Sequence, residues 1–269
     1  MQNNLTEINI DISNRVIKYP KFSIVSSKKI KLSDYIIIYN NGYNWKGVPL
    51  RIMNQYPVIH DTYLSNDSDG EKTIKITVYV CPYTLFSCMY FGEYIPNNKI
   101  FNNNIILEDI NEKGQYLIPI LNNLYNLGND KPLDEIIKRD EVRIMTLRNA
   151  LSSYTDILLF DDDKENKETI VPKNYYDIKD IIYKTFDFSK KYDPKQIIYI
   201  IEYKSSSTTD VFKKTVIIPK ENSMDIKSNG FKDYYDKMAL EIRDRGGIVY
   251  NCLWFAWNAL YPDSKVIQL

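Results

Sequence analysis

The pattern of apolar and polar positions predicts a chain built mainly of strands. Residues 74–80 (IKITVYV) alternate, which is typical of a half-buried strand with Lys75, Thr77 and Tyr79 on its polar face. The runs YIIIYN, QIIYIIEY and VFKKTVII are rich in β-branched and aromatic residues and predict further strands. Polar stretches predict loops between these strands, at residues 65–72, 161–168, 204–210 and 220–230.

One amphipathic helix is predicted over residues 230–245. An apolar stripe with helical spacings of four, three and four residues is formed by Phe231, Tyr235, Met238 and Ile242. A stripe of this kind is typical of a helix that packs on a core.

Two segments far apart in the chain share a pattern that predicts an internal repeat. Residues 146–160 (TLRNALSSYTDILLF) and 251–267 (NCLWFAWNALYPDSKVI) both contain Asn-Ala-Leu, then an Asp and a terminal apolar run. Each predicts a short helix, capped by Thr146 or Asn251, followed by a turn and a strand. We therefore predict an α+β, β-rich fold of two related halves packed as one globular unit. The predicted boundaries are a first half over 1–160, an acidic connecting loop over 161–170 and a second half over 171–269.

The charge balance and the lengths of the apolar runs exclude several classes of protein. There are 35 basic and 35 acidic side chains, and nucleic-acid-binding proteins usually show a basic excess, so we expect no nucleic-acid partner. The apolar runs are far shorter than the roughly 20 residues of a membrane-spanning helix, and the N-terminus does not resemble a signal peptide. Together with an odd count of three cysteines, this predicts an intracellular (cytoplasmic) or virion protein that is not secreted.

The composition carries a bias toward Ile, Lys, Asn and Tyr, with 23 tyrosines in the chain. A/T-rich codons encode these residues, so the bias indicates an A/T-rich genome. Large DNA viruses have such genomes, as do some protists and bacteria.

Three segments, GVPLRIMNQYPVIHDTY, ITVYVCPYT and WFAWNALYPDSKVI, resemble the uncharacterised prokaryotic domain-of-unknown-function family 3179. The segment TLRNALSSYTD resembles a mid-chain block of the same family. The matching residues are Pro49, Leu50, Arg51, Ile52, Asn54, Asp61, Thr62, Cys81, Pro82, Trp254, Phe255, Ala256, Trp257, Ala259, Pro262 and Asp263. The resemblance implies a divergent member of that family.

The departures from the family pattern bear on function. Tyr56 stands where the family has a histidine, His60 stands where it has an asparagine, and Thr84 replaces the second cysteine of a Cys-Pro-x-Cys motif. If the family has a site made of that histidine and the cysteine pair, this chain has lost half of it. The resemblance therefore implies a repurposed scaffold, in which Arg51 and Asp61 are the residues that we expect to matter most.

The remaining candidates for chemistry are one histidine and three thiols. His60 and Asp61 are neighbours on a predicted strand, so they point to opposite faces and are badly placed to form a dyad. Cys81, Cys88, Cys252 and His60 could form a four-ligand metal site, but the spacing lacks the local pairs that zinc sites use. The apolar surroundings of Cys88 and Cys252 predict buried thiols. We expect neither a metal nor a cofactor, since phosphate-binding and dinucleotide motifs are absent from the sequence.

These observations favour a non-catalytic structural or protein-interaction protein, with a large DNA virus particle as its setting. Its expected partners are proteins, and a larger assembly is one form they could take. Trp254 and Trp257 either form a core helix or act as an exposed anchor for a partner. The alternative is a thiol- or metal-dependent enzyme with a site around Cys81, His60 and Arg51, and Asp61 as a further candidate.

Overall fold

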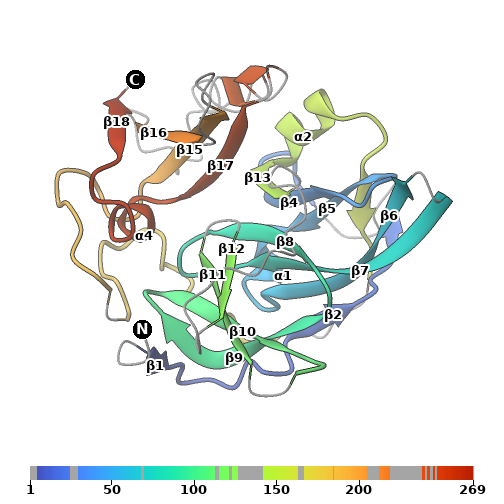
Figure 1. Cartoon of the computed structure of the whole chain (residues 1–269), viewed down its shortest axis with the longest axis horizontal. Helices are drawn as coiled ribbons and strands as arrows, with labels where there is room; N and C mark the ends of the chain where they lie inside the picture. Colours follow the sequence, from blue (N-terminus) through green and yellow to red (C-terminus); the bar gives the residue numbers. More distant parts are fainter. Residues whose placement is uncertain are drawn as a thin grey trace. The chain divides into compact units, whose positions relative to one another are not determined.

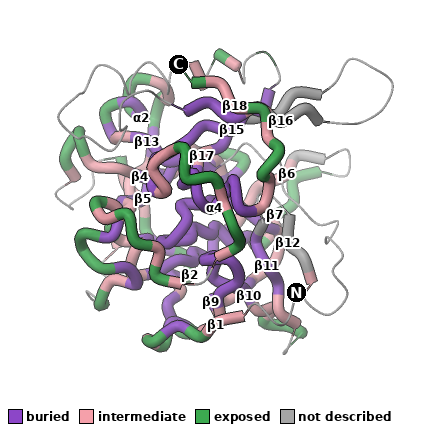
Figure 2. The backbone as a smooth tube through the Cα atoms, turned by 90° about the vertical axis from the view of Figure 1, so that its left-hand side faces the viewer, coloured by how far each residue is buried: buried purple, intermediate pink, exposed green. Residues whose placement is uncertain are grey.

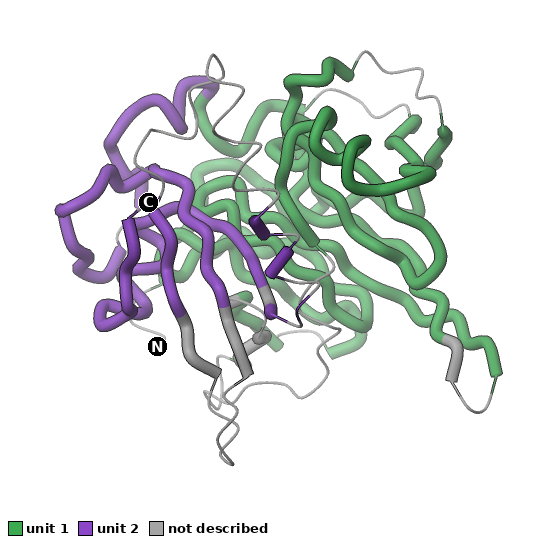
Figure 3. Tube along the Cα trace, turned by 90° about the horizontal axis from the view of Figure 1, so that it is seen from above, with its two compact units in different colours: residues 1–172 green, residues 173–269 purple. Residues whose placement is uncertain are grey.

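The computed structural model describes residues 5–24, 30–67, 70–112, 115–120, 123–126, 142–162, 167–183, 185–204, 212–218, 238–239, 241–242, 245 and 247–268. The protein is β-rich, as the sequence predicts, and its described strands form four sheets, A to D (Figure 1). The chain divides into two compact units, Met1–Pro172 and Lys173–Leu269 (Figure 3). This division follows the acidic stretch in which the sequence predicts a connecting loop, and residues 163–166 of that stretch lie outside the described residues.

The first unit contains sheets A, B and C. Sheet A has the spatial order β1 (Leu5–Glu7), β9 (Tyr94–Phe101), β10 (Asn104–Asp109), β11 (Tyr116–Ile120) and β12 (Asn123–Asn126). Sheet B has the order β2 (Val16–Lys18), β6 (Val58–Asp67), β7 (Gly70–Val80) and β8 (Ser87–Phe91). Sheet C has the order β13 (Val142–Thr146), β4 (Tyr35–Asn40), β5 (Trp45–Pro49), β14 (Leu158–Phe160) and β3 (Phe22–Ser23). The short helices are α1 (Leu50–Met53) and α2 (Leu147–Ser153).

Sheet B lies between sheets A and C, and this corrects the expectation for β7. The strand was expected to be half-buried, but residues 76–80 are all buried. Thr77 and Tyr79, on the face expected to be polar and exposed, reach sheet A and the turn before it: the Thr77 hydroxyl donates to the Gly92 carbonyl and the Tyr79 hydroxyl to the Ile105 carbonyl. A strand covered on both faces can therefore contain polar side chains, provided that their hydroxyls find acceptors.

The predicted loop over residues 65–72 is mostly strand. β6 and β7 pair antiparallel from Val58 with Tyr79 as far as Asp67 with Gly70, so they form one long hairpin. The polar composition of this segment reflects exposure of the strand ends, because residues 70–73 are exposed. Polar side chains do not prevent strand formation where a sheet extends into solvent.

The second unit contains sheet D, with the order β17 (Ile248–Leu253), β15 (Ile197–Lys204), β16 (Phe212–Ile218) and β18 (Lys265–Gln268), and the helix α4 (Trp254–Asn258). One face of the sheet has a cluster of Tyr199, Ile201, Ile217 and Val249, against which Met238, Ala239 and Ile242 pack. Met238 and Ile242 belong to the apolar stripe of the predicted helix, and both are helical. Phe231 and Tyr235 lie outside the described residues.

Sheets C and D share one topology and one register. In each, the first two strands pair antiparallel, a later strand joins the first strand antiparallel, and a short helix leads to a final strand parallel to the second. The pairing of residues across these four strands is also the same in both sheets. If Tyr39 is taken as equivalent to Ile201, Lys46 to Thr215 and Val142 to Val249, residues that lie opposite each other in sheet C correspond to residues that lie opposite each other in sheet D. We call this four-strand unit with its helix the module.

Only some of the sequence features that suggested a repeat lie at equivalent positions in the two modules. Asp156 and Asp263 each stand two residues before the final strand, and α2 and α4 each begin directly after the third strand. The shared Asn-Ala-Leu is out of register, because Asn149 is the third residue of α2 and Asn258 is the last residue of α4. Thr146 caps α2 through its hydroxyl, but the predicted cap Asn251 lies within β17, and Leu253 precedes α4 without a side-chain cap.

Candidate functional site

The three residues of the predicted enzyme site have separate partners in the first unit. Arg51 is exposed on α1 and pairs with the Asp34 carboxylate at 3.1 Å. The buried Cys81 thiol donates to the Asn103 carbonyl at 3.3 Å. His60 is buried, with Nε2 2.8 Å from the Tyr94 carbonyl oxygen. In the parts of the chain that the structure describes, no group of three or more His, Cys, Asp and Glu side chains is placed to hold a metal ion.

His60 and Asp61 point to opposite faces of β6, as expected for neighbours in a strand. The His60 ring contacts sheet A through Tyr94, whereas the Asp61 carboxylate contacts Tyr39 and Lys46 of sheet C. Because a carbonyl only accepts, Nε2 of a neutral His60 ring carries the hydrogen and Nδ1 the lone pair. Among the residues that the structure describes, Nδ1 has no hydrogen-bond partner, and it lies 3.6 Å from the Glu93 carboxylate. Burial lowers the pKa of the His60 imidazole below its usual value of 6.5.

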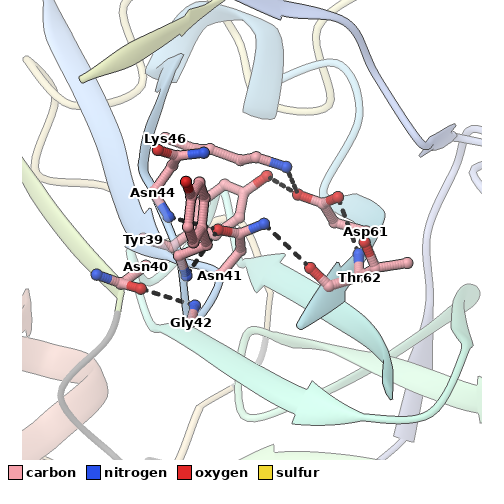
Figure 4. Close-up of polar contacts among 9 residues, drawn as sticks. Tyr39, Asn40, Asn41, Gly42, Asn44, Lys46, Asp61 and Thr62 are labelled. Atoms are coloured by element: carbon pink, nitrogen blue, oxygen red, sulfur yellow. Dashed lines mark hydrogen bonds and ion pairs between the residues drawn. The ribbon is translucent and has the colours of Figure 1, made fainter. Parts of the chain in front are cut away.

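The Asp61 cluster consists of Tyr39, Lys46 and Asp61 (Figure 4). One carboxylate oxygen, Oδ2, accepts from the Tyr39 hydroxyl at 2.7 Å and from the Lys46 ammonium at 2.6 Å. The other, Oδ1, accepts from the backbone N–H of Thr62 at 2.9 Å. The side chains of Lys46 and Asp61 are only 12% and 7% exposed. Burial raises the pKa of the Tyr39 phenol well above its usual value, and the negative charge of Asp61 acts in the same direction.

The hairpin formed by β4 and β5 also contacts β6 through its turn. The backbone N–H of Leu64 donates to the Asn41 carbonyl at 2.8 Å, and the Asn41 side-chain amide donates to the Thr62 carbonyl at 3.3 Å. Gly42 has a φ of +88°, and a Cβ at this position would lie 2.0 Å from the Leu64 carbonyl oxygen. The turn can approach β6 this closely only because residue 42 lacks a side chain.

The local sequence explains how these side chains meet. α1 directly follows β5 and leads within a few residues to β6, so Lys46 and Asp61 come from neighbouring strands in the chain. The Phe22 ring from β3 lies 4.7 Å from Lys46 Nζ and edge-on to Tyr39, with 6.3 Å between the ring centres. The lysine therefore lies between a carboxylate and an aromatic ring, and both favour its positive charge.

The thiol segment forms a second buried polar region. The Thr84 hydroxyl donates to the Asn104 side-chain oxygen at 2.7 Å. All three thiols are buried and free of disulfides, as expected from sequence for Cys88 and Cys252. Burial raises the pKa of Cys88 to about 12 and that of Cys252 well above its usual value. These two thiols are therefore protonated at neutral pH and inert as nucleophiles.

The two tryptophans proposed as an exposed anchor are core residues. Trp254 and Trp257 are 1% and 0% exposed. Their indole N–H groups donate within the second unit, to the Ser189 carbonyl at 2.9 Å and to the Ser264 hydroxyl at 3.0 Å. The core-helix interpretation fits α4, because a buried and satisfied indole offers no surface to a partner.

Tyr39 and Lys46 are the site residues that sequence reasoning missed. A lysine inside an otherwise apolar strand, WKGVP, is a signal for a buried partner, since lysine is almost never buried unpaired. The identity of that partner depends on β5 facing β6, and no local pattern reveals such a contact.

Comparisons with known proteins add no relatives. No family model, no curated protein and no solved structure matches this chain. The resemblance described from the three sequence segments stays a prediction. Within the described residues, none of the helices has the length and apolar character that crossing a membrane requires.

Proposed function

We propose that the protein is a non-catalytic structural or protein-interaction protein. The observation that carries this proposal is the Asp61 cluster, in which one carboxylate joins two strands of sheet C to sheet B. Both oxygens of Asp61 are occupied by donors from the chain itself. A carboxylate whose two oxygens are held by donors from neighbouring strands contributes to the fold.

The proposal is supported by the positions of the other candidate groups. The imidazole and the three thiols are buried, and Arg51 pairs with Asp34 at the surface. A nucleophilic site needs a nucleophile and a base within hydrogen-bond reach of each other, and the partners given above for Cys81 and His60 are different groups. The A/T-biased composition supports a large DNA virus particle as the setting, with other structural proteins as partners.

Elemental analysis of the purified protein tests the non-catalytic part of this proposal. We expect no zinc or iron in stoichiometric amount. A metal at about one equivalent per chain that is lost in Cys81→Ser would overturn it in favour of the metal-dependent enzyme, since ligand removal abolishes binding at a closed site.

Quantitative mass spectrometry of purified particles, compared with the soluble fraction of the same infected or producing cells, tests the setting. A structural component is expected to copurify with the particle at a constant ratio to other structural proteins through successive gradient steps. A chain that is found in the soluble fraction and washes off the particles contradicts that setting.

A further inference from the structure

The last strand of sheet D has an open outer edge. β18 pairs with β16 on one side, and among the strands that the structure describes none pairs with its other side. Figure 1 shows β18 as the outermost strand of the sheet. Lys265 and Gln268 are exposed, and Val266 and Ile267 are half-buried (Figure 2). Such an edge presents backbone N–H and C=O groups to any strand that can pair with it.

The opposite edge of the module is different. The strand at that edge is β13 in sheet C and β17 in sheet D, and the residues of both with described burial are mostly buried. Judged by the described residues of the second unit, the edge strand β18 is therefore more exposed than the edge strand β17.

In the first unit, the edge equivalent to that of β18 is occupied by a further strand. β14 is the counterpart of β18, and its outer edge carries β3 in antiparallel orientation, with Ser23 opposite Leu159 and Phe22 opposite Phe160. The Phe22 ring also packs edge-on against the Phe160 ring, with 6.2 Å between centres. The added strand thus supplies both backbone pairing and an apolar side chain.

The register shared by the two modules identifies the matching positions on β18. Val266 corresponds to Leu159 and Ile267 to Phe160. Both residues are apolar and only half-buried, so pairing with another strand would remove apolar surface from water.

We propose that two copies of the chain pair through β18, antiparallel across a twofold axis. This rests on the proposed function as a structural protein. A twofold axis places two copies of one strand antiparallel, which is the direction that β3 has on β14. Opposed residues of an antiparallel pair point to the same face of the sheet, so a twofold axis passes between one residue and its own copy. With Ile267 opposite the partner's Ile267, Val266 lies opposite the partner's Gln268, and the two Lys265 side chains do not face each other. The interface is short, well below the roughly 1,600 Å² of a standard complex, so the pairing is reversible and concentration-dependent.

Cysteine cross-linking tests the register directly. Ile267→Cys and Lys265→Cys are made as separate variants, and each is exposed to mild oxidation on its own. Opposed residues in an antiparallel pair have Cβ atoms about 5 Å apart, close enough for a disulfide. We expect a disulfide-linked dimer of Ile267→Cys, because its two thiols face each other at the axis. Lys265→Cys should stay uncrosslinked, because its two copies are separated by about 13 Å along the strands.

Sedimentation velocity over a concentration series measures the association itself. Ile267→Lys introduces two charges at the axis and is expected to weaken dimerisation at least about tenfold. Leu32→Lys is the matched control, because Leu32 is an exposed apolar residue of the other unit, and it should leave dimerisation unchanged. Circular dichroism verifies that both variants are folded.

The outcomes separate this inference from the proposed function. A chain that stays monomeric at its solubility limit, or an Ile267→Cys variant that gives no disulfide, overturns pairing through β18. An equal effect of Ile267→Lys and Leu32→Lys also overturns it. None of these results bears on the metal analysis, and a stoichiometric metal overturns the proposed function whatever the oligomeric state.

Discussion

Asp61 accepts hydrogen bonds from three donors on two oxygen atoms, and two of these donors belong to another sheet. Its charge is compensated locally by Lys46, which is itself mostly buried. Removing one member of a buried ion pair costs far more than removing one member of an exposed pair, because the partner is left charged and without compensation. Asp61 is therefore expected to be important for stability.

The matched exposed pair in this chain is Arg51 with Asp34. Asp61→Asn is expected to lower the free energy of unfolding by about 3 kcal/mol. Asp34→Asn should lower it by less than about 1 kcal/mol, since solvent screens exposed ion pairs. Urea denaturation of both variants measures the difference, and equal losses would contradict a structural role for the Asp61 cluster.

His60 lies on the other face of the same strand and gives the fold a pH dependence. Burial lowers its pKa in the folded state, and the positive charges of Lys18 and Lys75 act in the same direction. The Glu93 carboxylate and the hydrogen bond to Tyr94 oppose this shift without overcoming it. The folded protein therefore binds a proton on His60 at lower pH than the unfolded chain does.

The free energy of unfolding is expected to be highest above pH 6.5 and to fall as the pH decreases from there, because the unfolded chain protonates first. Denaturation curves between pH 8 and about 5 measure this slope. His60→Asn, which removes the titrating imidazole, should flatten it. Glu93 and Asp11, whose pKa values are lowered from 4.5 and 3.8, lose their contributions only at lower pH. An unchanged slope in the variant would assign the effect to another group.

At the scale of elements, the β4–β5 hairpin depends on a close contact between its turn and β6. Gly42 and Gly70 both have positive φ values, but only Gly42 has a neighbouring backbone in the space of a Cβ. A comparison of alanine substitutions at the two positions therefore separates the cost of backbone strain from the cost of the clash with β6.

Gly70→Ala is expected to cost about 1 kcal/mol from backbone strain. Gly42→Ala adds a clash with the Leu64 carbonyl and should cost about 3 kcal/mol or more, since the turn must move off β6. Thermal and urea unfolding of the two variants tests the comparison. Similar costs at both positions would mean that the turn moves freely away from β6.

Local patterns predict elements well in this chain and predict contacts between sheets poorly. The apolar runs of β4, β15 and β16 were found because β-branched residues are concentrated there. The burial of Thr77 and Tyr79 was missed, since alternation cannot show that a second sheet covers the polar face. The same limit explains the site: Asp61 was singled out by a resemblance, whereas Tyr39 and Lys46 depend on the packing of sheet C against sheet B.

At the scale of the whole molecule, burial of all three cysteines predicts a chain without reactive thiols. With an aromatic disulfide reagent at pH 8, the folded protein is expected to release thiolate only at the rate of unfolding, and denatured protein should release three equivalents per chain. The Lys265→Cys variant is the positive control and should react at once. A fast equivalent in the unmodified protein would favour the thiol-dependent enzyme.

The order of strands in sheet C also constrains how the first unit is made on the ribosome. β6, β7 and β8 of sheet B pair with their neighbours in the chain, so these contacts can form as soon as residues 58–91 have been synthesised. Sheet C stays incomplete until β13 and β14 emerge, after all of β9–β12. Its apolar residues, including Ile36 and Ile38, therefore stay exposed to solvent until the rest of the unit has been synthesised. Strand pairs between segments this far apart in the sequence form slowly. Synthesis thus has a stage at which this nascent chain needs protection from aggregation.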